Sequence, residues 1–320
     1  MKYSVVMCTY NGERFIADQI KSILAQTHKV DEILIFDDRS SDNTVRIAEE
    51  LLAESGISYR ITVNEVNKGV ARNFIDGMKC AAGDYIFTCD QDDVWKKTKV
   101  ETFHRHILKT GKMLYFSDGI VVDEHLNRTG SLWKSVKYDQ KREDISVTML
   151  KKDIVTGAAM AVSHRLAEMI EDIPESILHD RWCSLIATVN DSIECIRACT
   201  FFYRQHSNNV IGAKKLSFSE WIREMGIFNS KKQAEKRHQK ADVFCRLKKY
   251  CNKNNYARVA QRADFWYGCD RLPVIGRKKA VAFIFGNSLN GNYFRYRTGL
   301  ISAARDLYFV AVTSGKAKKA

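Results

Sequence analysis

The first ninety residues alternate short apolar runs with segments of helical periodicity. The apolar runs predict buried strands at 3–8, 32–36, 59–63 and 84–89. Between them, apolar residues recur at helical spacing and predict helices over 15–24, 45–52 and 70–80. Strands that alternate with helices indicate βαβ units, so we expect an α/β fold with a mostly parallel, doubly wound sheet.

Beyond residue 95 the pattern is less regular. We expect further strands at 112–117, 119–122, 158–162 and 196–204. A helix is expected to begin near Asp180, and the chain after residue 212 is again helical in pattern, as around 221–228. No stretch reaches the roughly 18 apolar residues typical of a membrane span.

Charge divides the chain near residue 212. Residues 213–320 hold 24 of the 51 Lys and Arg residues and 7 of the 38 Asp and Glu residues, a net charge of +17. Residues 1–212 hold the other 27 and 31, a net charge of −4. We therefore expect one domain over 1–212 and a basic, mainly helical C-terminal region over 213–320. Such a region favours a polyanion, either nucleic acid or an anionic membrane surface.

The cysteine pattern and the N-terminal sequence both predict the cellular compartment of the protein. The nine cysteines are scattered and include no CxxC, which argues against a disulfide framework or a zinc ribbon. The chain begins with a predicted strand and lacks the charged and apolar segments of a signal peptide. These features predict a reducing, cytoplasmic location.

Polar clusters follow three of the predicted strands, namely Thr9-Tyr10-Asn11, Asp37-Asp38 and Asp90-Gln91-Asp92-Asp93. In a doubly wound sheet, ligands bind beyond the carboxyl ends of the strands, so these clusters define a candidate site. Three carboxylates within four residues repel one another unless a cation or hydrogen-bond donors compensate. Their oxygens suit Mg²⁺ or Mn²⁺, which complete their shells with substrate phosphates. The alternatives are a solvated turn at Asp92 and helix caps at Asp38 or Asp42.

Four segments together resemble the donor half of family 2 glycosyltransferases of the GT-A fold: SVVMCTYNGERF, ILIFDDRSSDNT, NKGVARN and DYIFTCDQDDVW. They occur in the family order over residues 4–95. The resemblance implies that Asp38 reads the base and that Asp90 approaches the ribose of the nucleotide. It also implies a nucleotide pocket lined by Thr9, Tyr10 and Glu13.

The same resemblance implies that Lys68 and Arg72 lie by the diphosphate and that Asp92 ligates Mn²⁺ or Mg²⁺. A surface role is the alternative for Lys68 and Arg72.

The downstream half resembles the family more loosely. The family usually has a Glu-Asp pair at a helix start, and the corresponding pair here is His179-Asp180, in LHDRW. The resemblance implies that Asp180 is the catalytic base, and an N-cap is its alternative role. The segment YRQHSNN resembles the Arg-x-His loop of the family, which implies that His206 completes the metal or diphosphate site. A plain surface histidine is the alternative.

The resemblance implies inverting, metal-dependent transfer of a sugar from a nucleotide-sugar donor to a saccharide or lipid-linked acceptor in bacterial surface polysaccharide synthesis. QDDVW is similar to rhamnosyltransferases that use dTDP-rhamnose, although UDP-hexose enzymes share much of it. Leu178 stands where processive synthases have the Gln of Gln-x-x-Arg-Trp, so we expect single-sugar transfer. The donor half is expected over about 1–95 and the acceptor half over about 96–212.

Two rival functions stay open. One is a nucleic-acid-binding protein whose basic tail carries interleaved aromatic residues, namely Trp221, Tyr250, Tyr256, Trp266 and Tyr267. The other is a non-catalytic module that binds sugar nucleotides. We expect no nucleic acid partner, because lipid-linked acceptors lie at the anionic cytoplasmic leaflet, which also attracts Lys and Arg. The segment 281–285, after Arg277-Lys278-Lys279, is expected to rest on that surface, as in a peripheral protein at the inner face of the cell membrane.

Overall fold

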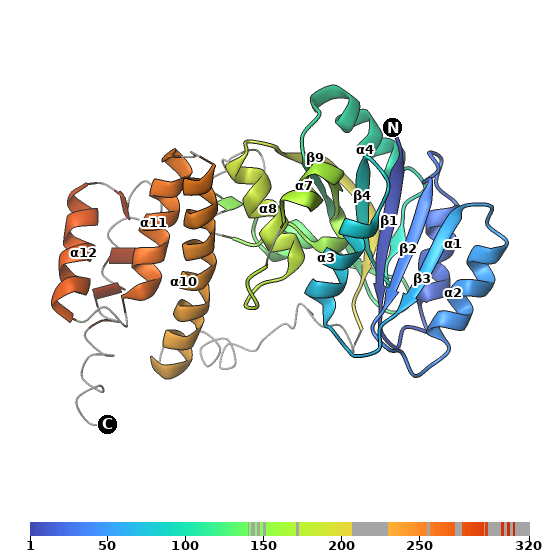
Figure 1. Cartoon of the computed structure of the whole chain (residues 1–320), viewed down its shortest axis with the longest axis horizontal. Helices are drawn as coiled ribbons and strands as arrows, with labels where there is room; N and C mark the ends of the chain where they lie inside the picture. Colours follow the sequence, from blue (N-terminus) through green and yellow to red (C-terminus); the bar gives the residue numbers. More distant parts are fainter. Residues whose placement is uncertain are drawn as a thin grey trace. The chain divides into compact units, whose positions relative to one another are not determined.

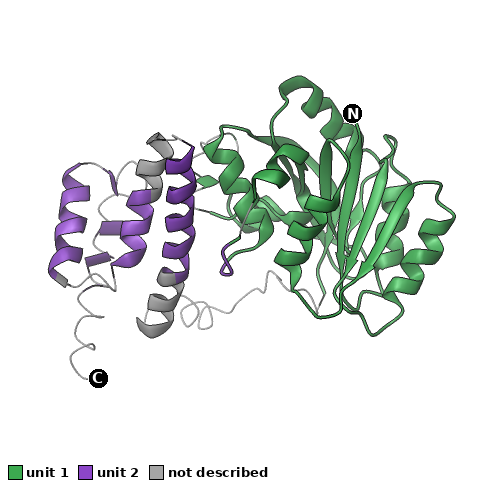
Figure 2. Cartoon of the chain, in the orientation of Figure 1, with its two compact units in different colours: residues 1–173, 177–213 green, residues 174–176, 214–320 purple. Residues whose placement is uncertain are grey.

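The structure is a computed structural model that forms two compact units (Figure 2). Unit 1 comprises residues 1–173 and 177–213, and unit 2 comprises residues 174–176 and 214–320. The residues that the structure describes are 1–139, 141, 145, 148–149, 152–170, 173–206, 230–254, 257–272, 277–290, 292–293, 302–303, 306–307 and 310.

Unit 1 is built on one mixed sheet flanked by helices (Figure 1). The order of the described strands is β3-β2-β1-β4-β8-β6-β9-β5, with β7 paired to β6. The strands are β1 (Tyr3–Thr9), β2 (Glu32–Asp37), β3 (Ser58–Val63), β4 (Tyr85–Asp90), β5 (Val94–Trp95), β6 (Leu114–Val122), β7 (Arg128–Ser131), β8 (Met160–Ser163) and β9 (Ile193–Arg204). The helices are α1 (Ile16–Leu24), α2 (Thr44–Ala53), α3 (Val70–Cys80), α4 (Lys99–Thr110), α5 (Leu132–Ser135), α7 (His164–Met169) and α8 (His179–Val189), with a 3₁₀ turn, η1 (Gly157–Ala159).

The predicted parallel pattern holds across the first four strands, where β3, β2, β1 and β4 pair in parallel. Beyond them β8 runs antiparallel to both β4 and β6, and β6 pairs in parallel with β9. The two strands predicted at 112–117 and 119–122 are one strand, β6, whose register with β9 shifts around Asp118. A shifted register lets one long strand continue past an irregular residue.

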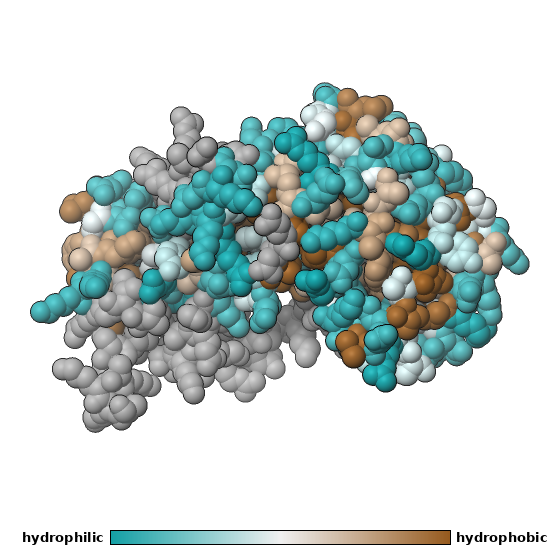
Figure 3. All heavy atoms as spheres, in the orientation of Figure 1, coloured by the Kyte–Doolittle hydropathy of each residue, from teal (hydrophilic) through white to brown (hydrophobic). Residues whose placement is uncertain are grey.

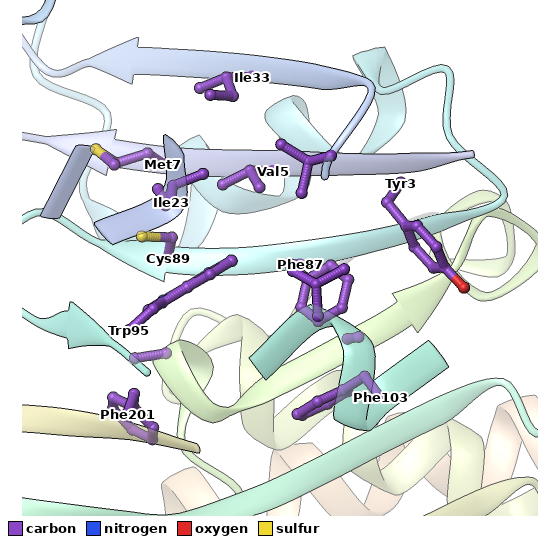
Figure 4. Packing of buried hydrophobic residues seen from close by; sticks show 14 of the residues in the cluster. Tyr3, Val5, Met7, Ile23, Ile33, Phe87, Cys89, Trp95, Phe103 and Phe201 are labelled. Carbon is purple, nitrogen blue, oxygen red and sulfur yellow. The ribbon is translucent and has the colours of Figure 1, made fainter. Parts of the chain in front are cut away.

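The core of unit 1 explains why these segments fold as they do. Residues Tyr3–Met7 of β1 are buried throughout, as expected for a parallel strand covered on both faces. Helix α1 buries Ile16, Ile20 and Ile23, the positions that its apolar period predicts. These side chains belong to a cluster that also contains Phe87, Trp95, Phe103 and Phe201 (Figure 4).

Helix α3 approaches the sheet closely at Gly77. A Cβ atom on Gly77 would lie 2.4 Å from Cγ1 of Val6 and 3.1 Å from the ring of Phe36. The absence of a side chain therefore sets the distance between α3 and the strands β1 and β2.

Unit 2 contains the helices α10 (Ser230–Lys253), α11 (Ala257–Arg271) and α12 (Arg277–Leu289). Its core includes Phe265, Ile284 and Tyr293. The carboxylate of Asp306 is wholly buried and pairs with Arg237 at 2.8 Å, while Tyr293 donates a hydrogen bond to its other oxygen at 3.0 Å. Buried charges need such partners, so this ion pair ties the unit together. The helix expected at 221–228 lies outside the described residues.

The prediction that the whole segment 281–285 rests on a membrane surface is wrong, because much of the segment packs within unit 2. Ile284 is 1% exposed, and Val281 and Phe283 pack against the same core. Phe285 and Leu289 instead point outward, with 57% and 86% exposure, and hydrophobic residues reach the surface over α12 (Figure 3). Within the described parts of the chain, no helix combines the length and apolarity needed to span a bilayer.

Candidate active site at the carboxyl ends of the strands

The ends of β1, β2 and β4 bring the predicted donor motifs together. The register pairs Thr9 with Asp37 and Cys8 with Asp90. The buried hydroxyl of Thr9 donates to Oδ2 of Asp37 at 2.7 Å, so it ties β1 to β2. Tyr10 is 52% exposed, and its backbone exchanges two hydrogen bonds with the side-chain amide of Gln91. Three strand ends are thereby joined at one edge.

Glu13 lies on the loop after β1 and reaches the start of α2. Its Oε2 accepts hydrogen bonds from both the backbone N–H and the side-chain amide of Asn43, at 3.0 and 2.9 Å. The N-cap of α2 is Asn43, so the helix caps expected at Asp42 or Asp38 are wrong. Oδ1 of Asp42 nevertheless accepts the backbone N–H of Thr44, the first residue of α2, at 3.0 Å. The loop after β1 and the start of α2 therefore form one hydrogen-bonded layer.

The carboxylate of Asp38 organises the loop before α3. Oδ1 accepts the side-chain amide of Asn64 at 2.9 Å and the backbone N–H of Lys68 at 2.8 Å. Oδ2 accepts the backbone N–H of Gly69 at 2.9 Å. A carboxylate has about four acceptor positions, so the loop engages most of them. This buried network gives Asp38 a structural role, and its predicted contact with the base stays a prediction.

Lys68 and Arg72 share one partner at the start of α3. Asp76 pairs with Lys68 at 3.2 Å and with Arg72 at 3.0 Å. Both basic side chains are well exposed, so these ion pairs contribute little to stability. Their place beside the loop that Asp38 orders is compatible with a diphosphate contact.

The structure joins Asp92 to His206. Oδ2 of Asp92 lies 2.8 Å from Nε2 of His206, and both side chains are largely buried. The imidazole stacks on Phe15 with the ring centroids 4.8 Å apart. Arg204 holds the preceding strand end, since its guanidinium pairs with Asp18 at 2.9 Å and its backbone N–H donates to Asp93 at 3.1 Å. His206, two residues after β9, is thus held beside the acidic motif.

A carboxylate beside an imidazole is a donor set that suits Mn²⁺ and tolerates Mg²⁺. Among the described residues, His, Cys, Asp and Glu side chains nowhere gather in threes as a preformed metal site. The remaining ligands of a cation at Asp92 and His206 would therefore come from a diphosphate and water, as is usual at phosphate-binding metal sites. The two residues fit a divalent cation on these terms.

Burial and mutual repulsion raise the pKa values of the other two acidic residues of the motif, Asp90 and Asp93. Burial, followed by the charges of Asp92 and Asp180, raises the pKa of Asp90 to about 7. Burial, followed by the charges of Asp92 and Asp90, raises the pKa of Asp93 well above its usual range. Geometry also links Asp180 to β4, because Gly157 donates its N–H to Asp180 and accepts the hydroxyl of Thr88, two residues before Asp90. Carboxylates with strongly raised pKa values often mark a functional site.

Asp180 lies in the first turn of α8. The helix begins at His179 and its N-cap is Leu178, so the alternative of Asp180 as the N-cap is wrong. Oδ2 of Asp180 accepts the backbone N–H of Gly157 at 2.9 Å, and Oδ1 accepts the N–H of Arg181 at 2.6 Å. Burial raises the pKa of Asp180 to about 6 despite these hydrogen bonds. A carboxyl with that pKa is ionised at neutral pH and is a stronger base than an exposed aspartate.

His179 is buried beside this carboxylate. Its ring stacks on Phe74 at 4.0 Å between centroids, and burial lowers its pKa to about 3. Neither ring nitrogen has a hydrogen-bond partner among the described residues. A Cβ atom on Gly157 would lie 2.8 Å from Nε2 of His179. The neutral imidazole therefore packs as an aromatic ring against the turn that holds Asp180.

The burial of Tyr203 and Lys99 was not predicted from the sequence. Tyr203 packs against the unit 1 core, with its ring centroid 6.4 Å from that of Phe201. Burial, followed by the charges of Asp90, Asp93, Asp92 and Asp180, raises the pKa of Tyr203. Tyr203 belongs to the segment that resembles the Arg-x-His loop. Side chains alternate along a strand, which would have placed Tyr203 on the same face as the buried Phe201. Lys99 is wholly buried, which no pattern in its helix predicts.

Known glycosyltransferases are similar to this chain in sequence. The chain is 31% identical to the dTDP-rhamnosyl transferase RfbG of Shigella flexneri, over 70% of this chain and 80% of RfbG. It is 32% identical to the UDP-Glc:alpha-D-GlcNAc-diphosphoundecaprenol beta-1,3-glucosyltransferase WfgD of Escherichia coli, over 38% of this chain and 47% of WfgD.

Solved structures share the fold at low sequence identity. S. aureus TarS 1–349 in complex with UDP-GlcNAc aligns with a TM-score of 0.57 and 14% identity, over 100% of this chain and 92% of TarS 1–349. The mannosyltransferase PcManGT from Pyrobaculum calidifontis, in complex with GDP-Man and Mn²⁺, aligns with a TM-score of 0.51 and 13% identity, over 97% of this chain and 86% of PcManGT.

The family comparison covers the donor motifs and reaches into α7. Residues 4–168, just over half of the chain, match the family described as Glycosyl transferase family 2. Together with the 31% identity to RfbG, this match shows that the chain belongs to glycosyl transferase family 2 and is a glycosyltransferase of the GT-A fold.

Proposed function

We propose that this glycosyltransferase transfers a single sugar, with inversion, from a nucleotide sugar to a hydroxyl of a saccharide or lipid-linked saccharide in bacterial surface polysaccharide synthesis. The observation that carries the proposal is the hydrogen-bonded link from Asp180 to β4, because Gly157 donates to Asp180 and accepts the hydroxyl of Thr88. A base on α8 is thereby held beside the strand that ends in the donor-side motif. In this proposal residues 1–95 bind the donor and residues 96–212 the acceptor.

The chemistry requires one base. The acceptor hydroxyl gives its proton to Asp180 while its oxygen forms a bond to the anomeric carbon. The bond from that carbon to the diphosphate oxygen breaks, and its electron pair leaves with the nucleoside diphosphate. Attack on the face opposite the leaving group inverts the anomeric centre, and no carboxylate nucleophile takes part.

The donor side divides into two groups of residues. In this proposal Asp38 and Asp90 recognise the base and ribose, and the nucleotide pocket is lined by Thr9, Tyr10 and Glu13. The diphosphate lies by Lys68 and Arg72.

Asp92 and His206 would hold a divalent cation, Mn²⁺ or Mg²⁺, in this site. When bound, the cation would offset the negative charge that develops on the diphosphate. The fold-level neighbour PcManGT, which is in complex with GDP-Man and Mn²⁺, supports this assignment.

The preferred donor is dTDP-rhamnose, supported by the similarity to the dTDP-rhamnosyl transferase RfbG. A UDP-hexose is the second candidate, supported by the shorter match to WfgD. A thermal-shift panel of dTDP-rhamnose, UDP-glucose and GDP-mannose with Mn²⁺ tests the choice, because a ligand at about 100 times its Kd stabilises the folded state by roughly 2.7 kcal/mol. If no sugar nucleotide raises the Tm, the donor-site assignment fails.

Transfer itself is tested with Asp180→Asn. Loss of the general base should lower the rate of sugar transfer by roughly 10²- to 10⁴-fold and leave nucleotide binding intact. Asp191→Asn is the matched control, because Asp191 follows the same helix and its left-handed backbone suits asparagine. Full activity in Asp180→Asn would show that another group is the base.

The protein is also proposed to act at the inner face of the cell membrane. The +17 net charge of residues 213–320 favours an anionic surface. Lys278, Phe285 and Leu289 are exposed at positions that share one face of α12, a combination typical of helices that lie in a membrane interface.

A further inference from the structure

Lys99 is the first residue of α4, and its side chain is wholly buried. Its Nζ donates a hydrogen bond to the carbonyl oxygen of Ala158 at 2.6 Å. The same atom lies 4.1 Å from the ring centroid of Trp95 and 4.7 Å from that of Phe201, two members of the unit 1 core (Figure 4). An ammonium group is thus enclosed by two aromatic faces and one carbonyl.

This position is costly for a cation. Burial removes water from the ammonium and lowers the pKa of Lys99 to about 8. The helix dipole also disfavours a positive charge in the first turn of α4. The aromatic faces and the carbonyl offset part of this cost. An apolar side chain would fill the same space without it, so packing alone does not account for a lysine here.

The hydrogen bond of Lys99 leads to the proposed base. Its acceptor, Ala158, belongs to the turn η1, and Gly157 of the same turn donates its N–H to Asp180. The hydroxyl of Thr88 on β4 donates to the carbonyl of Gly157 at 2.5 Å. The buried side chains of Lys99 and Thr88 thus donate to the carbonyls of Ala158 and Gly157. The amide of Gly157 in turn donates to the carboxylate of Asp180.

We propose that Lys99 is a positioning residue for sugar transfer: its buried hydrogen bond to Ala158 fixes the turn Gly157–Ala159 that orients Asp180. The effect on transfer rests on the proposed function of Asp180 as the base. The link from Lys99 to Asp180 is independent of that function and is measured without substrate.

The test compares Lys99→Met, which removes charge and donor, with Lys99→Gln, which keeps a donor for Ala158. Lys97→Met is the control, since Lys97 is exposed two residues earlier. Carboxyl ¹³C NMR of Asp-labelled protein gives the pKa of Asp180, assigned by its missing resonance in Asp180→Asn. Arg181, Asp153, Asp90, Tyr203 and Cys183 also interact with Asp180 and stay unchanged in every variant.

Lys99→Met should raise the pKa of Asp180 by about one unit, because the Gly157 hydrogen bond that lowers it is weakened. Lys99→Gln should raise it less, and Lys97→Met should not change it. With an active donor and acceptor pair, Lys99→Met should lower kcat roughly a hundredfold with little change in the KM for the donor. Its Tm should fall, because the buried carbonyl of Ala158 loses its donor, and the Tm of Lys99→Gln should fall less.

Two results would overturn the proposal. The first is a folded Lys99→Met protein with an unchanged Asp180 pKa and unchanged kcat. The second is failure of both Lys99 variants to fold, which would make the lysine a purely structural residue. A wild-type protein that transfers no sugar, yet shows the predicted pKa changes, would contradict the proposed function and leave the link from Lys99 to Asp180 standing.

Discussion

Oδ2 of Asp92 and Nε2 of His206 lie 2.8 Å apart, although the two residues are 114 positions apart in the sequence. Asp92 follows β4 and His206 follows β9, so the pair joins the donor motif to the end of the last described strand of unit 1. A cation that binds between them must displace this contact, and the imidazole must be neutral to ligate it. The pair is therefore a closed contact that a metal–diphosphate complex would open.

Removal of either partner should weaken metal-dependent nucleotide binding. We expect Asp92→Ala and His206→Ala each to lower the affinity for dTDP or UDP in the presence of Mn²⁺ by roughly 10- to 100-fold, and to have little effect in EDTA. Isothermal titration calorimetry measures both conditions. His125→Ala is the control, since His125 is exposed on the loop after β6. Equal losses with and without Mn²⁺ would instead indicate a direct contact with the nucleotide.

The activity should depend on pH through Asp180. Burial raises its pKa to about 6, and only the ionised carboxylate accepts a proton, so kcat/KM should rise with pH through about 6 and then level off. A pH series of initial rates at saturating Mn²⁺ measures this rise in kcat/KM. A rise centred near the ordinary pKa of an aspartate would contradict a buried base.

The same shift has a consequence for stability. The pKa of Asp180 in the folded state lies above the unfolded value of 3.8. The contribution of Asp180 to the free energy of unfolding is therefore fully present below pH 3.8. That contribution to the free energy of unfolding is lost as the pH rises through about 6.

Gly157 should tolerate no side chain. A Cβ atom would lie 2.8 Å from Nε2 of His179, so Gly157→Ala should displace the ring or the turn and misplace Asp180. We expect a fall in kcat of roughly a hundredfold. The double variant Gly157→Ala/His179→Ala should recover part of the loss, because the clashing ring is gone. Gly130→Ala serves as the control, since no atom lies within 4 Å of its added Cβ.

Membrane binding should depend on the exposed face of α12. The double variant Phe285→Ser/Leu289→Ser should reduce sedimentation with anionic phosphatidylglycerol vesicles, since two exposed apolar side chains are removed. Leu108→Ser is the control, because Leu108 is 64% exposed on α4 of unit 1. Tight oligonucleotide binding without vesicle sedimentation would favour a nucleic acid partner instead.

The fold of the first ninety residues was largely predictable because its signals are local. The period of apolar residues located β1 to β4 and their helices, and the polar residues after the strands marked the edge where Asp92 lies. Tertiary burial was not predictable in the same way. Lys99 has the sequence context of a surface lysine, and Ile284 that of a membrane-facing residue, yet both lie in cores. The cap alternative for Asp180 was wrong because the helix starts at His179, two residues earlier than a cap at Asp180 requires.

The proposed base and the proposed metal-ligating histidine are supplied by one continuous stretch of chain, from α8 through β9 to His206. The proposed donor residues all lie before it, between Thr9 and Asp92. Exchange of this one segment would therefore replace both groups together and leave the proposed nucleotide-binding frame unchanged.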